Sequence, residues 1–197
     1  MTGSGEMEIE KTNWNLRSVI PHFRPSIAAS FLFLGLMMSV WTSRTVAAQS
    51  THIPDFEMAD QFGEEVSHTD LDGKWTVMMV ADRQGSTFSS ELGAYLESGL
   101  SPLYPDMVFM AVANLEGAPR LIRSLIRKGI RRSNKTPVLL DWRGIFQASY
   151  PLSEQSVDVF LFNPSGNLTH HSTHHSFDSS ATDQLGHRIS GILSNSQ

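Results

Sequence analysis

From residue 54 onwards, short apolar runs alternate with longer segments in which apolar residues recur at helical spacing. The run at 75–81 carries no charged residue, which is typical of a strand buried on both faces of a sheet. Gly, Asn and Asp residues separate the runs, as turns require. The expected strands are 54–66 (two short strands around Gly63), 75–81, 105–116, 136–146 and 156–171. This alternation predicts a mixed α/β domain.

Three segments have helical periodicity. The first runs to Leu100, with Ser86 or Thr87 as its expected N-cap. The second covers 117–134 and the third covers 180–193. The apolar residues of the second helix fall on one side, which we expect to pack in the core. Large aromatic side chains are expected in the core as well; they are those of Trp75, Tyr95, Phe109, Trp142 and Phe160.

The first 48 residues differ from the rest. Basic residues precede the uncharged stretch 25–43, and its strongly apolar part at 27–41 has the length of a signal-peptide core rather than of a spanning helix. Small residues at Val46 and Ala48 predict cleavage after Ala48. The alternative is an uncleaved anchor, residues 25–43, in the inner membrane. Both alternatives place the domain at 49–197 outside the cytoplasm, in the periplasm or secreted.

The composition excludes several functions. The chain has no cysteine, so disulfides, thiolate metal sites and thiol catalysis are excluded. Its formal net charge of −5 argues against general nucleic-acid binding, which needs many cations facing phosphates. No motif in the chain predicts a cofactor.

Three segments between residues 53 and 195 are similar to segments of one superfamily. They read IPDFEMADQFGEEVSHTDLDGK at 53–74, TPVLLDWRGIFQASYPL at 136–152 and VDVFLFNPSGNL at 157–168. In this order and spacing they resemble exported thioredoxin and peroxiredoxin-related members of the thioredoxin-like superfamily. The resemblance implies an α/β three-layer fold, with a central mixed sheet flanked by helices.

Members of that superfamily carry Cys-x-x-Cys, or one peroxidatic cysteine, at the start of the first long helix. Aligned on 91–94, the Cys-x-x-Cys positions match Gly85 and Phe88, and the peroxidatic position matches Phe88. The family's cis-proline matches Val157, where we expect a trans bond, because a cis bond before a non-proline residue costs about 2.5–4 kcal/mol. The resemblance therefore implies a redox-inactive relative without catalytic residues.

A narrower resemblance is to the bacterial YtfJ-type periplasmic family of unknown function. It rests on the signal segment, GKWTVMMVADR at 73–83 and YPLSEQSVDVFLFNPSG at 150–166. It implies a cysteine-free exported domain without a known chemistry.

The mouth of the former redox site is one candidate binding cleft. Asp82, Arg83, Ser86 and Thr87 lie where a strand end meets a helix N-terminus. Backbone N–H groups there, with the Arg83 guanidinium, can bind an anion or a peptide carboxylate. The alternative is ordinary capping with a surface ion pair.

The second helix is a candidate docking face. Counted from Gln49, the chain has 11 Lys and Arg against 17 Asp and Glu, and seven of those 11 cations lie within 120–135. They suit an anionic membrane surface or an acidic envelope protein, or they form a solvated face. The candidate residues are Arg120, Arg123, Arg127, Lys128, Arg131 and Arg132.

Four histidines, His170, His171, His174 and His175, are weak candidates for a metal site. On a strand, residues four apart are separated by about 13 Å. Zinc ligands must approach the ion to about 2.1 Å, so these pairs alone cannot close a site. We therefore expect exposed histidines, which can titrate at about pH 5–8.

Two functions remain open. The favoured one is a redox-inactive binding or accessory protein in the cell envelope, with an unknown envelope protein or an anionic membrane as partner. The alternative is a non-thiol enzyme, or a histidine metal-binding protein, on the same scaffold.

Overall fold

The computed structural model describes residues 50–196. The predicted signal segment and its cleavage after Ala48 lie outside these residues. Residues 46–197 form a compact unit by themselves. Among the described residues, no helix is both long enough and apolar enough to cross a membrane.

A five-stranded mixed sheet lies at the centre, in the order β5-β4-β3-β6-β7. The strands β3, β4 and β5 are parallel, whereas β6 and β7 run antiparallel to their neighbours. All residues of β3 and β6 are buried, since their apolar side chains are covered on both faces of the sheet. The bounds are Thr76–Ala81 for β3, Val108–Asn114 for β4, Val138–Asp141 for β5, Val157–Phe162 for β6 and Leu168–His174 for β7.

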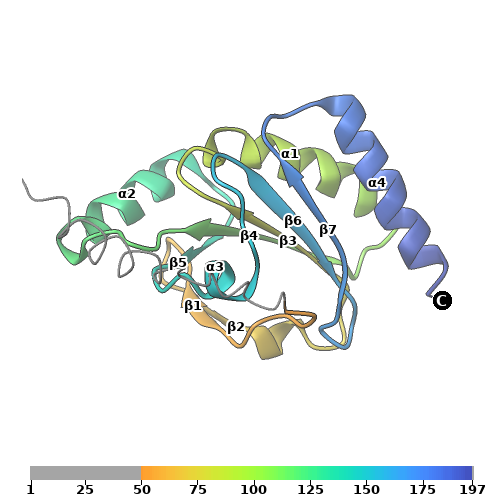
Figure 1. The fold of residues 1–197 in the computed structure, drawn as a ribbon, viewed down its shortest axis with the longest axis horizontal. Helices are drawn as coiled ribbons and strands as arrows, with labels where there is room; N and C mark the ends of the chain where they lie inside the picture. Colours follow the sequence, from red (N-terminus) through yellow and green to blue (C-terminus); the bar gives the residue numbers. More distant parts are fainter. Residues whose placement is uncertain (1–49, 197) are drawn as a thin grey trace, which may run out of the picture. The chain divides into compact units, whose positions relative to one another are not determined.

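Two helices cover one face of the sheet, α1 (Ser86–Leu100) and α4 (Ser179–Ser194), as Figure 1 shows. Their apolar stripes, which include Leu92, Leu96 and Ile189, meet Val77 and Val159 of the sheet in the first core. The helices end within a residue of the predicted limits, because their 3.6-residue periodicity is regular.

A small hairpin and a short helix cover the other face. The hairpin pairs β1 (Glu57–Ala59) with β2 (Glu65–Ser67) and continues into a 3-10 turn at His68–Leu71, and the helix is α3 (Ile145–Ser149). The second core here includes Phe56, Met78, Phe146, Tyr150 and Phe160. Helices, sheet and hairpin thus form the three-layer α/β architecture that the sequence predicted.

The strand expected at 136–146 ends early. It stops at Asp141, and the chain turns at Gly144, whose φ of 68° is a left-handed conformation that suits glycine. The Asp141 carboxylate accepts hydrogen bonds from the N–H groups of Arg143 and Phe146. That turn starts α3, a five-residue helix too short for its periodicity to be recognised in the sequence.

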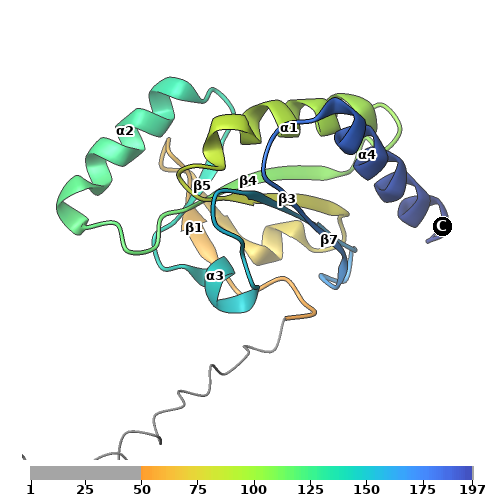
Figure 2. The same ribbon diagram turned by 45° about the horizontal axis from the view of Figure 1, so that its top comes forward.

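The helix α2 (Arg123–Ser133), preceded by a 3-10 turn at Arg120–Ile122, connects β4 to β5. In both ribbon views it stands off one end of the sheet (Figures 1 and 2). None of its residues is buried. Leu121 is 93% exposed, Leu125 65% and Ile122 42%. The prediction that this apolar side packs in the core is therefore wrong.

The large aromatic side chains also differ from expectation. Phe160 is fully buried, and Trp75 and Phe109 pack partly buried against the first core. Tyr95 is exposed, with its hydroxyl donating to Asp183. Trp142 lies outside both cores, under the guanidinium of Arg123.

Candidate functional site

Gly85 and Phe88, which the alignment matches to the superfamily's cysteines, lie at the start of α1. Phe88 is the third residue of α1 and packs, half-buried, against the first core. Gly85 directly precedes the helix and is buried. The carboxylate of Asp82 closes the turn, since its Oδ1 accepts from the N–H groups of Gln84 at 2.9 Å and Gly85 at 2.7 Å.

Gly85 lies directly against the backbone of Ser156. A Cβ atom built on Gly85 would overlap the Ser156 carbonyl oxygen and would lie 2.5 Å from its carbonyl carbon. Real Cβ atoms essentially never approach another atom closer than 3.0 Å. No side chain fits at this position, therefore, unless the backbone of Ser156 moves.

Several hydrogen bonds hold the segment around Ser156 in place. The N–H of Gln155 donates to Asp82 Oδ2 at 2.9 Å, and the N–H of Ser153 donates to Asp158 Oδ2 at 3.2 Å. The Ser156 hydroxyl donates to the Ser153 carbonyl at 2.8 Å. Asp82 thus joins the start of α1 to the segment before β6. The start of α1 and the segment 153–156 are therefore in direct contact.

Val157 is the residue that the alignment matches to the family's cis-proline. Val157 begins β6, and no peptide bond within 50–196 is cis, so the bond before Val157 is trans as predicted. Val157 pairs with Ala81, the last residue of β3. Val157 and the start of α1 therefore both lie next to the end of β3.

The four residues predicted at the mouth lie together, but the side chains of Asp82, Ser86 and Thr87 are bonded within the chain. The hydroxyl of Ser86 donates to the Arg83 carbonyl and that of Thr87 to the Gln84 carbonyl. The predicted N-cap is wrong, because α1 begins after Gly85 without a side-chain cap. Arg83 is exposed. Anion binding by these residues stays a prediction.

A cavity of about 260 Å³ opens beside this mouth, with Asp82, Asn114, Ser153 and Asp158 among its lining residues. Asp158 is buried, with Thr173 Oγ1 donating to its Oδ1 at 2.6 Å and His171 Nε2 at 2.9 Å from the same oxygen. Burial favours the neutral acid, but hydrogen bonds from His171, Thr173 and Ser153 outweigh it and hold the pKa of Asp158 below its usual 3.8. Asp158 therefore anchors β7 and the Ser153 segment to β6.

The strand β7 separates the four histidines, as the two-residue period of a strand predicts. The ring of His171 stacks on Phe160 with ring centroids 4.4 Å apart. His170 and His174 pair with Leu161 and Val157, whose side chains belong to the first core on the other face. His175 follows the end of the strand.

The expectation of exposed histidines holds for His175 alone, because β7 keeps His170, His171 and His174 partly buried. Burial lowers the pKa values of His170 and His174 from 6.5, with Arg188 contributing at His170. Among the described residues, no group of three or more His, Cys, Asp or Glu side chains is arranged to hold a metal ion.

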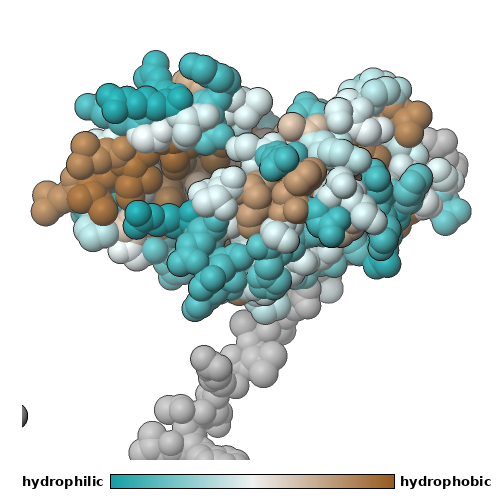
Figure 3. Space-filling model, turned by 90° about the horizontal axis from the view of Figure 1, so that it is seen from above, coloured by the Kyte–Doolittle hydropathy of each residue, from teal (hydrophilic) through white to brown (hydrophobic). Residues whose placement is uncertain are grey.

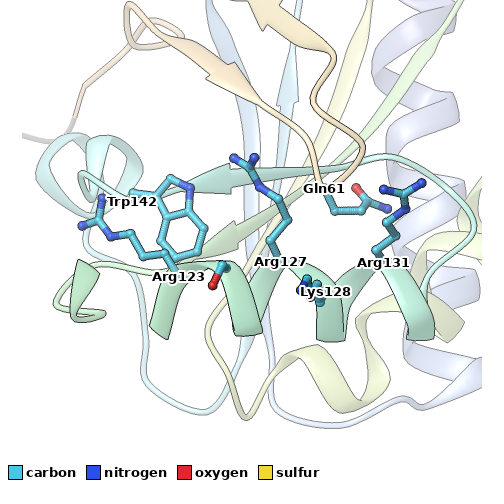
Figure 4. A pocket seen from close by; sticks show the side chains of 7 residues that line it. Gln61, Arg123, Arg127, Lys128, Arg131 and Trp142 are labelled. Carbon is cyan, nitrogen blue, oxygen red and sulfur yellow. The ribbon is translucent and has the colours of Figure 1, made fainter. Parts of the chain in front are cut away.

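The basic side of α2 lines a cleft of about 530 Å³. Figure 4 shows Arg123, Arg127 and Arg131 rising from the helix towards Trp142 and Gln61. The guanidinium of Arg123 lies 5.1 Å from the centre of the Trp142 ring, and that of Arg131 lies 5.6 Å from the centre of the Phe62 ring. Such cation–π contacts hold the guanidinium groups in place.

Gln61 forms the fixed wall of this cleft. Its side-chain amide donates to the Thr136 carbonyl at 2.8 Å, and its oxygen accepts from the Val138 N–H at 2.7 Å. The C-terminal end of α2 is held by the Ser90 hydroxyl, which donates to Asn134 Oδ1 at 2.9 Å. The sequence predicted the basic residues but missed Gln61 and Trp142, because they come from segments far apart in the chain.

The cations of the cleft are not neutralised by ion pairs within the described residues. Arg123, Arg127, Lys128 and Arg131 form no ion pair with any residue of the described part of the chain. Beside them, Leu121, Ile122 and Leu125 form what we call the apolar patch of α2. Figure 3 shows hydrophobic surface over this end of the molecule, at the left, bordered by hydrophilic residues.

No protein-family model matches the chain, and no curated protein matches it either. Solved structures do match. One, described as the thiol:disulfide interchange protein DsbE from Chlorobium tepidum, has a TM-score of 0.56 and 16% identity over 74% of this chain and 98% of that one. The pneumococcal exposed lipoprotein thioredoxin Etrx1 from Streptococcus pneumoniae has a TM-score of 0.52 and 18% identity, over 68% and 98% of the two chains.

A mutant of PrxQ from Xylella fastidiosa matches with a TM-score of 0.54 and 9% identity, over 74% of this chain and 98% of that one. At these identities the likeness concerns the fold alone. The chain has the thioredoxin-like fold, and it has no cysteine. The narrower YtfJ-type resemblance stays a prediction.

Proposed function

We propose that the protein is exported and that its mature domain, residues 49–197, works by binding, as a redox-inactive accessory protein of the cell envelope. The observation that carries the proposal is the contact between Gly85 and the Ser156 backbone. A domain that had lost only its sulfur atoms would keep space for them. Here backbone occupies the space that a cysteine side chain needs.

Export is supported by the basic and apolar pattern of the first 48 residues and the small residues before Gln49. The name of one similar structure, an exposed lipoprotein thioredoxin, describes a protein of the same fold outside the cytoplasm. Binding is supported by the cleft and the apolar patch of α2. The cations there form no ion pair with a carboxylate of the described residues, and the leucines face solvent.

The redox part of the proposal is tested by restoring both family positions. In Gly85→Cys/Phe88→Cys, the first thiol meets the Ser156 backbone, so we expect no reduction of insulin disulfides by the purified domain. The control for folding is Phe88→Cys, which replaces a half-buried side chain by a smaller one and should leave the domain folded. Insulin reduction by the double variant at the rate of an ordinary thioredoxin would contradict the proposed closure of the site.

The binding part is tested by retention on the immobilised domain. Residues 49–197 suit this test because residues 46–197 form a compact unit by themselves. We expect the domain to retain a component of an envelope extract, and Arg127→Glu/Arg131→Glu to lose it, since both cations face the cleft. Lys74→Glu/Arg188→Glu makes the same charge change elsewhere and should retain it. Equal retention by both variants would contradict a role for α2.

A further inference from the structure

We infer that α2 docks the domain on an anionic membrane surface, with its leucines in the interfacial layer and its cations on lipid phosphates. The inference rests on the binding function proposed above and names the partner.

The outer edge of α2 combines the two kinds of side chain that such a surface binds. Leu121, Leu125, Lys128 and Arg132 are spaced by three, four or seven residues, so they share one side of the helix. All four are exposed. An amphipathic helix lying in the interface places its apolar side chains at the boundary of head groups and acyl chains, and its cations among the head groups.

The alternative, that this edge of the helix is simply solvated, does not explain its exposed leucines. Leu121 and Leu125 are 93% and 65% exposed, and they lie one helical turn apart. Single exposed leucines are common, but adjacent ones beside Ile122 form a patch that water does not favour. The leucines contribute little to the fold, because neither the 3-10 turn that holds Leu121 nor α2 contains a buried residue.

The distribution of charge determines which surface this edge faces. Residues 120–135 hold seven Lys and Arg and no acidic residue, whereas the rest of 49–197 holds four Lys and Arg against 17 Asp and Glu. An anionic surface therefore attracts α2 and repels the rest of the domain. This difference orients the domain with α2 towards the membrane. The patch also lies on a projecting helix, and a fluid interface receives projecting side chains without a matching hollow.

The cleft supplies the contacts to phosphate. Arg123 and Arg131 lie over the rings of Trp142 and Phe62. The Nε–H of Arg123 donates to the Ala118 carbonyl at 3.3 Å, so it is the terminal N–H groups of Arg123 that can donate to a phosphate, together with those of Arg131. Lys128 lines the cleft and lies one turn from Leu125, so phosphates bound there are at the level of the leucines.

Vesicle sedimentation tests the inference with residues 49–197, which lack the apolar N-terminal segment. We expect binding to phosphatidylcholine vesicles that contain about 30% phosphatidylglycerol, whose negative surface attracts basic residues. Vesicles of phosphatidylcholine alone should bind little. Binding should weaken as salt is raised, because the Debye length shortens to about 8 Å at physiological ionic strength.

Two variants separate the contributions. Lys128→Gln/Arg132→Gln should weaken vesicle binding about thirty-fold, the effect expected for two basic residues at an anionic surface. Leu121→Ser/Leu125→Ser should weaken it at least about ten-fold, since two apolar side chains no longer leave water. The matched controls are Leu103→Ser, at an equally exposed position (66%), and Lys74→Gln/Arg188→Gln, and both should bind like the unchanged domain.

Three results would overturn the inference. They are absence of binding to anionic vesicles, equal binding to both kinds of vesicle, and unchanged binding by the leucine variant. Binding of inorganic phosphate without vesicle binding counts against it as well, because the cleft would then serve a free anion. If the domain retains an envelope protein but does not bind vesicles, the membrane inference is wrong and the proposed binding function still holds.

Discussion

Gly85 and Gly99 stand at the two ends of α1 in opposite surroundings. A Cβ atom at Gly85 meets the Ser156 backbone, whereas a Cβ atom at Gly99 has no atom within 4 Å. Gly85→Ala should therefore lower the free energy of unfolding by about 1–3 kcal/mol, the usual cost of overpacking. Gly99→Ala should raise it by about 0.5–1 kcal/mol, because alanine favours the helical conformation.

Urea unfolding of both variants measures this difference. If the Gly85→Ala domain has the same free energy of unfolding as the unchanged domain, the backbone around Ser156 can move at little cost. The argument for a closed site would then fail. A loss at Gly99 would point instead to a general intolerance of side chains along α1.

Asp158 gives the domain a defined dependence on acid. Its pKa is lower in the folded than in the unfolded chain, because the hydrogen bonds from His171, Thr173 and Ser153 favour the carboxylate. The resulting stabilisation is fully present above the unfolded value of 3.8 and is lost as the pH falls through the lower folded value. Asp158→Asn should remove it and lower the unfolding free energy at pH 7 by about 1.5–3 kcal/mol, the range for hydrogen bonds to a charged group.

The measurement is the free energy of unfolding in urea from pH 7 down to pH 2. The difference between the unchanged domain and Asp158→Asn should narrow below about pH 4. Asp106→Asn, at an exposed position, is the control and should leave the neutral-pH stability within about 0.5 kcal/mol. A difference that stays constant down to pH 2 would show that the charge of Asp158 is not involved.

Among the elements, α2 is the one whose apolar side is not part of a core. Leu121→Ser/Leu125→Ser should change the unfolding free energy by no more than about 0.5 kcal/mol per residue, as is usual at the surface. Leu92→Ser, at a fully buried position of α1, should cost at least about 2–5 kcal/mol. A large decrease in the unfolding free energy of the α2 variant would instead support the expectation from the sequence that this apolar side packs in the core.

The pattern of apolar residues predicted most helices and strands, but it did not predict which other elements pack against them. The regular repeat of apolar residues located α1 and α4, and short apolar runs located the buried strands β3 and β6. The same repeat located α2 and showed that it has an apolar side, but it carries no information on whether another element covers that side. The N-cap prediction at Ser86 or Thr87 was wrong because the turn before α1 is closed by another residue. The Asp82 carboxylate, at the end of the strand, accepts from the N–H groups of Gln84 and Gly85, so a hydroxyl cap is unnecessary.

The candidate site was predictable only in part, at the scale of the whole molecule. Alignment on a family pattern matched Gly85, Phe88 and Val157 to the family's redox positions, and this match stays a prediction. The closure of that site depends on Ser156, about seventy residues away from Gly85 in the chain, and only the folded sheet brings the two together. The cleft beside α2 needs Gln61 and Trp142 in the same way.

Export is a property of the whole chain and is tested on the whole chain. Expressed in a bacterium from its own first residue, the protein should accumulate outside the cytoplasm with Gln49 as its N-terminus, as mass spectrometry of the intact protein would show. Ala48→Arg removes the small residue that cleavage requires and should leave the longer form bound to the inner membrane. Ser50→Arg, just beyond the cleavage site, is the matched control and should still be processed. A full-length form of the unchanged protein in the inner membrane would favour the anchor at 25–43. In that case the domain would already be held close to lipid, and α2 would need only a weak attraction to lie on the surface.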